Sequence, residues 1–145
     1  MMDHTKILQV LQWFLEMISG SGVYWYLEGR ANLLVQGIPV TCADIDITTT
    51  KEGYEKIKSL MALPFTELHE PHKMKHALHY NIAGVDLEIA WYYDTHKPFC
   101  TAVQVLSWNG LQLHTAPLLH AIAFYEYIGK HDRAELIRKH LQSPL

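Results

Sequence analysis

The stretch Asp44-Ile-Asp-Ile47 constrains the fold of this chain more than any other part of the sequence. Acidic and β-branched apolar residues alternate in it, which is typical of a β-strand with one polar and one buried face. In an extended chain, Asp44 and Asp46 project to one face while Ile45 and Ile47 pack on the other. Two close carboxylates oppose each other's ionisation, and a divalent cation is the usual means of keeping both ionised. The pair therefore predicts a magnesium site on a β-sheet.

A glycine upstream adds a second feature. Gly29 follows the apolar segment Tyr24 to Leu27, predicted to be a strand, and precedes the apolar segment Ala31 to Gln36, predicted to be a short helix. The backbone N–H groups of such a turn and helix start can face an anion such as phosphate. A metal ion held by carboxylates beside a phosphate cradle is the equipment of phosphoryl or nucleotidyl transfer, so the sequence favours that class of chemistry.

A later segment, Gly84-Val-Asp-Leu-Glu-Ile89, is predicted to be a strand with a similar pattern. Asp86 and Glu88 alternate in it with apolar residues, so both acids share one face. Alone, this pattern indicates only the polar face of an exposed strand. Acids that separate strands bring to one place are costly to bury without a cation, and beside Asp44 and Asp46 they strengthen the prediction of a metal site.

These motifs together resemble a known protein family. The order Gly29-Arg30, a helix, Gln36 to Val40 and then Asp44 to Ile47 resembles the core motif of the minimal nucleotidyltransferases of the DNA polymerase beta superfamily. The resemblance extends over residues 23–89. It implies a nucleotidyltransferase fold in which a later strand supplies a third carboxylate.

The resemblance also implies a mechanism. Asp44, Asp46 and Glu88 would be the catalytic residues and the ligands of one or two magnesium ions, with Asp86 as a further candidate metal ligand. The ions would bridge the phosphates of a nucleoside triphosphate, and an acceptor hydroxyl would attack the α-phosphorus with loss of pyrophosphate. The acceptor stays open, because nothing in the sequence separates a small metabolite, a protein hydroxyl and a nucleic-acid end.

Nucleotide binding is assigned to Gly29 and Arg30, and the second residue departs from the family. Gly29 would admit the phosphates close to the backbone, whereas Arg30 replaces the family's serine. An arginine can pair with phosphate through several charged donors. It can equally neutralise Asp44 and Asp46 without metal. The sequence thus leaves two hypotheses: an active magnesium-dependent nucleotidyltransferase, or a catalytically degenerate nucleotidyltransferase-like binding or regulatory protein, for example the partner of a toxin.

The periodicity of the whole chain predicts an α/β (α+β) fold with one domain, residues 1–145, in which helices flank a mixed sheet and a helical pair forms the C-terminal end. Asn109-Gly110 predicts a two-residue hairpin, and Gly129 separates the last two helices. Further helices are predicted at 3–18, with Asp3 as its cap, at 52–63, with Thr50 as its cap, and at 117–128 and 131–141; further strands are predicted at 65–68, 76–82, 85–91, 103–108 and 111–114.

Four histidines lie between residues 69 and 79, so a transition-metal site has to be weighed. Their spacing disfavours it, because His76 and His79 would point to opposite faces of a strand and Pro71 would interrupt a helix through His72. We interpret the histidines as polar edge residues of a hairpin, with His76 or His79 near the active face.

Several charged residues near the predicted site are interpreted as solvated. Glu28, directly before Gly29, is taken as a strand-end carboxylate. Lys73 and Lys75 are the cations of the histidine segment, and contact with a triphosphate is their alternative role. The C-terminal helical segment carries further cations that are interpreted as solvated, with contact with a triphosphate or an acceptor as the alternative: Lys130, Arg133, Arg138 and Lys139.

Composition narrows the class of protein. Of 145 residues, 49% are hydrophobic and 19% charged, which is typical of a globular chain, and the net charge of −3 gives no general attraction to nucleic acid or membranes, although a local basic patch stays open. We find no signal peptide and no apolar spanning run, which predicts a cytoplasmic protein with Cys42 and Cys100 as free thiols. The aromatic segment Trp91 to Phe99 is interpreted as a packed loop that closes the sheet edge, with base stacking as the alternative, and Trp91 to Tyr93 suit a homodimer or partner contact.

Overall fold

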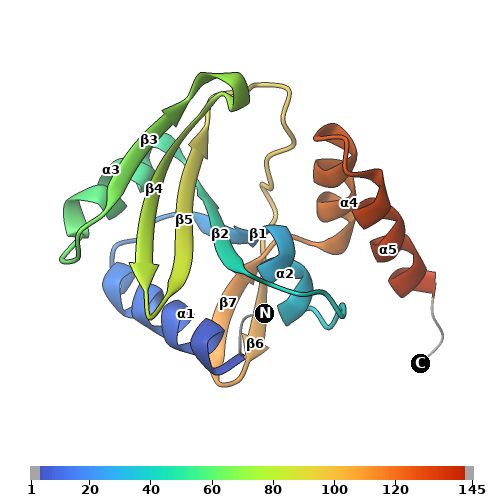
Figure 1. Cartoon of the computed structure of the whole chain (residues 1–145), viewed down its shortest axis with the longest axis horizontal. Coiled ribbons are helices and arrows are strands. Elements are labelled where there is room, and N and C mark those ends of the chain that lie inside the picture. The colour runs from blue at the N-terminus through green and yellow to red at the C-terminus, as the bar shows by residue number, and fades with distance from the viewer. Residues whose placement is uncertain (1–3, 143–145) are drawn as a thin grey trace.

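The computed structural model describes residues 4–142, so the predicted cap Asp3 lies outside the described residues. One mixed sheet of seven strands, in the order β3-β4-β5-β2-β1-β7-β6, is flanked by helices (Figure 1). This confirms the α/β prediction. The elements are α1 (His4–Ile18), β1 (Trp25–Glu28), α2 (Gly29–Val35), β2 (Asp44–Thr49), α3 (Lys51–Leu60), β3 (Thr66–Glu70), the 3-10 helix η1 (Pro71–Lys73), β4 (Lys75–Ile82), β5 (Val85–Tyr92), β6 (Gln104–Trp108), β7 (Leu111–Thr115), α4 (Leu118–Tyr127) and α5 (His131–Gln142).

Helices α1 and α3 cover one face of the sheet, and the main hydrophobic core lies between these helices and that face. Ile7 and Phe14 of α1 are fully buried, and they belong to the same apolar cluster as Ile45 and Ile47 of β2. The alternation of β2 therefore orients the sheet, because its isoleucines must face the helices. Its aspartates consequently face the other way.

The C-terminal pair α4 and α5 stands to the side of the opposite face (Figure 1). A second apolar cluster joins these two helices to α2 and the loop after it, through residues such as Leu33, Ile38, Phe124 and Ile137. The packing of this cluster holds the helical pair beside the polar face of the sheet. No helix in residues 4–142 combines the length and apolarity that crossing a membrane requires.

The predicted elements occur within two residues of their predicted bounds, except for the end of one helix. Helix α3 ends at Leu60, three residues before the predicted end, because Met61 has an extended backbone. Helix α2 begins at Gly29, two residues before the predicted start. The Thr50 cap is confirmed, since its side chain accepts a hydrogen bond of 3.0 Å from the backbone N–H of Gly53.

Candidate active site

Three carboxylates form a row across the central strands of the sheet. Asp46 of β2 pairs in register with Glu28 of β1 on one side and with Glu88 of β5 on the other. Residues paired across neighbouring strands share a face, so all three side chains project from the polar face. Asp44 and Asp86 form the adjacent pair of acids. Strand register thus brings together the acids of the two predicted motifs and adds Glu28 as a third carboxylate in the row.

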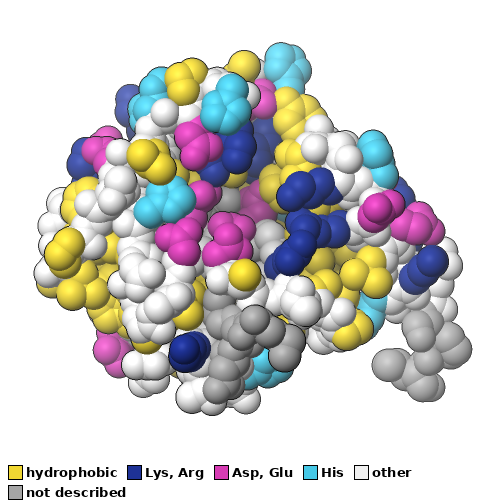
Figure 2. Space-filling model, viewed as in Figure 1, with side chains coloured by type: hydrophobic (Ala, Val, Ile, Leu, Met, Phe, Trp, Pro, Cys, Tyr) yellow, Lys and Arg dark blue, Asp and Glu magenta, His cyan; other side chains and the backbone are white. Residues whose placement is uncertain are grey.

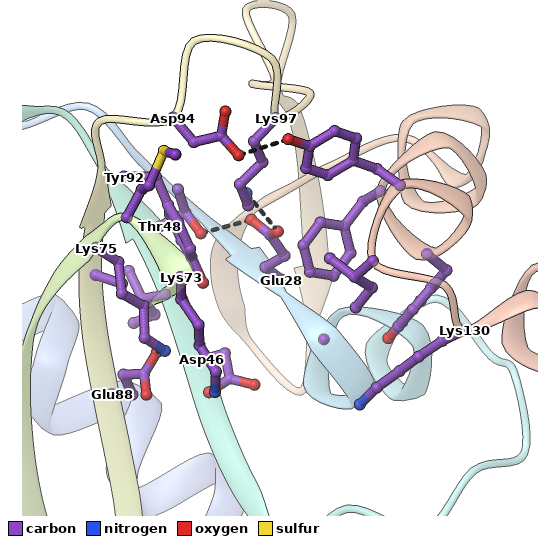
Figure 3. A pocket seen from close by; sticks show the side chains of 18 of the residues that line it. Glu28, Asp46, Thr48, Lys73, Lys75, Glu88, Tyr92, Asp94, Lys97 and Lys130 are labelled. Carbon is purple, nitrogen blue, oxygen red and sulfur yellow. Dashed lines mark hydrogen bonds and ion pairs between the residues drawn. The ribbon is translucent and has the colours of Figure 1, made fainter. Parts of the chain in front are cut away.

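The row lines a cavity of about 800 Å³ between the sheet and the C-terminal helices (Figure 3). Asp44 and Asp46 belong to its wall, whereas Asp86 is exposed and does not line it. The lining therefore favours Glu88 over Asp86 as the third acid of the site. On the far side, the Tyr127 hydroxyl of α4 donates a 2.6 Å hydrogen bond to Asp94 and ties the helix to the loop after β5.

Gly29 lies against Asp46. Its φ of +68° is in the left-handed region, and a Cβ at this position would stand 2.6 Å from Oδ2 of Asp46. A side chain here would therefore be strained by its backbone and would displace the central carboxylate. Gly29 also lines the cavity, as the sequence predicts for a phosphate contact.

We expect Gly29→Ala to lower the free energy of unfolding by about 1–2 kcal/mol, from backbone strain and displacement of Asp46. Urea denaturation measures the change. Gly129→Ala is the matched control, because Gly129 has a similar φ of +78° with no atom within 4 Å of its added Cβ. Equal losses for the two variants would contradict a role for the contact with Asp46.

The central carboxylate carries negative charge that its neighbours do not neutralise. Burial, together with the nearby charges of Glu88 and Asp44, raises the pKa of Asp46 to about 7, although the charge of Lys75 opposes the rise. Within residues 4–142, neither Asp46 nor Asp44 forms an ion pair with a cationic side chain. A divalent cation would relieve this excess negative charge.

The two outer carboxylates each have a buried lysine. Lys97 lies 3.0 Å from Glu28, and each of the two side chains is 6% exposed. Glu28 also accepts a 2.5 Å hydrogen bond from the Thr48 hydroxyl, and the Lys97 ammonium lies 4.0 Å from the ring centre of Tyr92 (Figure 3). The interpretation of Glu28 as a solvated carboxylate is therefore wrong, because β1 lies in the middle of the sheet and the loop after β5 covers its end.

Lys75 occupies the corresponding position at the other end of the row. Its ammonium lies 2.7 Å from Oε1 of Glu88, and the residue is only 5% exposed. The interpretation of Lys75 as solvated is thus also wrong. Lys73 has a side chain that is 57% exposed, as that interpretation expects, and it also lines the cavity. Among residues 4–142, no three acidic, histidine or cysteine side chains are arranged to hold a metal ion. The acids that remain available to bind a metal ion are Asp44 and Asp46, because Glu88 is paired with Lys75.

The histidines divide between the two faces of the sheet, as predicted. His79 faces the acids, with ring nitrogens 3.4 Å from Asp86 and from Glu88. His76 stacks on Trp91 with ring centres 5.0 Å apart, on the opposite face. Trp91 is consequently half-buried in side-chain packing, and its neighbour Tyr92, rather than Trp91, lines the cavity.

Arg30 does not neutralise the aspartates. Within the described chain no ion pair joins it to Asp44 or Asp46, and it does not line the cavity. The opposite wall instead carries Lys130, directly before α5, and Arg133, in the first turn of α5. Burial lowers the pKa of Lys130, and the charges of Arg133, Arg30 and Lys73 lower it further. Figure 2 shows acidic side chains and Lys or Arg side chains on facing sides of the hollow.

Sequence reasoning missed Lys97 as a member of this site. It lies in a loop 69 residues from Glu28, and no local motif indicates its pairing. Only its position between aromatic residues, with Tyr92 and Phe99 on either side, could have drawn attention to it. Cys42 and Cys100 are buried free thiols, as predicted.

Comparison with known proteins identifies the fold. No protein-family profile and no curated protein sequence matches this chain significantly. A putative nucleotidyltransferase from Thermotoga maritima matches with a TM-score of 0.76 and 22% identity, covering 97% of this chain and 95% of that one. The solution structure of the antibiotic-resistance factor ANT(2″)-Ia matches with a TM-score of 0.68 and 15% identity, covering 97% and 86%.

The crystal structure of ANT(2″)-Ia in complex with adenylyl-2″-tobramycin matches with a TM-score of 0.62 and 13% identity, covering 92% of this chain and 88% of that one. At such low sequence identity, structural similarity shows a shared backbone fold but not shared site residues. The chain therefore has the nucleotidyltransferase fold that its motifs predict.

Proposed function

We propose that this protein is a magnesium-dependent nucleotidyltransferase, which moves a nucleoside monophosphate from a nucleoside triphosphate to an acceptor hydroxyl. The observation that carries the proposal is the position of Asp46. This carboxylate lies in the middle of a row of acids, faces a cavity, and forms no ion pair within residues 4–142. The shared fold with nucleotidyltransferases supports the same class of reaction.

Asp44 and Asp46 would hold the magnesium ion, and Glu88 is the third candidate ligand. The raised pKa of Asp46 fits this assignment, because a carboxylate with uncompensated charge gains most from a cation. When bound, magnesium would offset the charge of the phosphates and lower the pKa of the acceptor hydroxyl. Gly29 places its backbone at the cavity wall beside these acids and is the proposed phosphate contact.

The far wall supplies positive charge for the triphosphate. Lys130 and Arg133 face the cavity from the C-terminal helices, across from the acidic strands. An arginine can bind phosphate oxygens with two parallel hydrogen bonds, and a lysine adds a point charge. In this arrangement the nucleotide phosphates lie between a metal-bearing wall and a basic wall. Arg30 does not line the cavity, so the role of phosphate-binding cation is proposed for Lys130 and Arg133 instead.

The acceptor is proposed to be a small molecule with a hydroxyl group. The cavity volume of about 800 Å³ is within the range of small-ligand sites. ANT(2″)-Ia, which shares the fold, has been solved in complex with an adenylylated small molecule. The net charge of −3 gives no general attraction to a nucleic-acid acceptor.

Calorimetric titration with the four common nucleoside triphosphates, with and without magnesium, tests this function. We expect the natural chain to bind at least one triphosphate only with magnesium, and the double variant Asp44→Asn with Asp46→Asn to bind it at least about tenfold more weakly, because the cation loses both ligands. Asp86→Asn is the matched control, since Asp86 does not line the cavity. Triphosphate binding that is independent of magnesium and of both aspartates would contradict the proposal.

One observation favours a second function. Lys75 already neutralises Glu88, as an internal cation would in a nucleotidyltransferase-like protein without catalysis. Such a protein would bind a partner and regulate it. The same titration separates the two functions, because a degenerate scaffold would bind none of the four triphosphates in the presence of magnesium.

A further inference from the structure

Lys75 lies between two carboxylates and satisfies only one of them. Its ammonium is 2.7 Å from Oε1 of Glu88, a hydrogen-bonding distance, and 3.8 Å from Oε2 of Glu70, which is too long for a hydrogen bond. That oxygen of Glu70 is buried and has no hydrogen-bond partner within the described chain. The structure therefore contains an unused acceptor close to a buried lysine.

Lys75 and a metal ion compete for the carboxylate of Glu88. The Lys75 ammonium takes one of its carboxylate oxygens, and a divalent cation beside Asp46 would require an oxygen of the same group. A divalent cation bound to the same carboxylate would also repel the Lys75 ammonium, and burial strengthens this repulsion. A cation that recruits Glu88 therefore competes with the lysine for this carboxylate.

We propose that Lys75 is an exchangeable counter-ion, which neutralises Glu88 when the site holds no metal and moves to Glu70 when a divalent cation binds. This inference rests on one part of the proposed function, the binding of a divalent cation at Asp44 and Asp46. It adds a residue of this chain that sets the affinity for that cation. Glu88 thereby has a positive partner in both states, which avoids the cost of leaving its buried charge unpaired.

The surroundings of Lys75 allow this exchange. A lysine ammonium is carried on a flexible four-carbon stem, so a shift of about 1 Å toward Glu70 needs no movement of the backbone. Glu70 is otherwise approached only by Lys73 among the described residues, at 3.6 Å and from an exposed position. It therefore lacks a buried counter-ion of its own. Figure 3 shows Lys75 beside Glu88, with Asp46 on the neighbouring strand.

Titration of Mn²⁺ alone, without nucleotide, tests the proposal in the natural chain and in Lys75→Met. We expect the variant to bind Mn²⁺ about tenfold more tightly, because the cation no longer competes for Glu88. Its melting temperature is expected to fall without Mn²⁺ and to recover with it. Lys58→Met is the matched control, since it removes the same charge from a Lys–Glu pair, that with Glu67, outside the cavity.

A milder variant provides a second test that does not depend on the folding of the first. Glu70→Gln leaves the pair of Lys75 with Glu88 intact but removes the negative charge that would receive the displaced lysine. We expect it to weaken Mn²⁺ binding a few-fold.

Equal Mn²⁺ affinity in the natural chain, Lys75→Met and Glu70→Gln would overturn the exchange and leave the proposed function standing, provided that Asp44→Asn with Asp46→Asn still abolishes binding. Weaker binding by Lys75→Met would also overturn it, because the lysine would then support the metal ligands. No Mn²⁺ binding by the natural chain, Lys75→Met or Glu70→Gln would overturn both the exchange and the magnesium-dependent function.

Discussion

Asp46→Asn is expected to stabilise the protein at pH 8 without divalent cations, by about 4 kcal/mol of unfolding free energy. The reason is the environment of the natural residue. Burial and the charges of Glu88 and Asp44 raise the pKa of Asp46 to about 7. Ionisation of this carboxylate in the folded state is therefore costly, and asparagine has a similar shape without the charge.

The sign of the pH dependence follows from the raised pKa. Below about pH 4, Asp46 is protonated in both the folded and the unfolded chain, so it does not destabilise the fold. As the pH rises from about 4 to 7, the unfolded chain releases the proton while the folded chain retains it. The stability contributed by the protonated group is thus lost over this interval, and the natural chain should lose stability relative to Asp46→Asn.

Urea denaturation of both proteins at pH 4.5 and pH 8, with a chelator, measures this difference. The advantage of the variant should be much smaller at pH 4.5. Addition of magnesium at pH 8 should stabilise the natural chain and leave the variant nearly unchanged, because the cation binds only where the carboxylate is present. Asp86→Asn, at an exposed position of the adjacent row, should show no comparable gain. A pH-independent difference would show that Asp46 is well solvated.

Lys97→Met is expected to destabilise the protein by about 3–5 kcal/mol, the cost of removing one partner of a buried ion pair. Glu28 would keep its hydrogen bond with Thr48 but lose its only cation within the described chain. The pair is almost completely shielded from water, so solvent cannot replace the lost partner. The loss would also remove the contacts of the lysine with the rings of Tyr92 and Phe124.

Denaturation of three variants separates these contributions. The double variant Glu28→Gln with Lys97→Met should recover a large part of the loss, because it leaves no unpaired charge. Lys58→Met breaks an ion pair that water reaches and should cost far less than Lys97→Met. A loss below about 1 kcal/mol for Lys97→Met would mean that water reaches Glu28 once the lysine is removed.

Local patterns in the sequence were sufficient to predict most of the fold. The alternation around Asp44 and Asp46 determines which side chains share a face, because the two-residue period of a strand is a property of the extended backbone. The hairpin at Asn109-Gly110 forms as predicted, with positive φ at both residues. The Thr50 cap likewise depends on atoms three residues apart. Such features need no information about distant parts of the chain.

The acids of the site could be predicted, but their neutralisation could not. The row of Glu28, Asp46 and Glu88 requires that three strands pair in one register. Lysines 75 and 97 then compensate the two outer acids and leave the central one without a partner. The sequence by itself determined the fold class and the shared face of Asp44 and Asp46, because backbone periodicity is local. Only the tertiary structure decided which charges are buried and paired, because the exclusion of water depends on segments far apart in the chain.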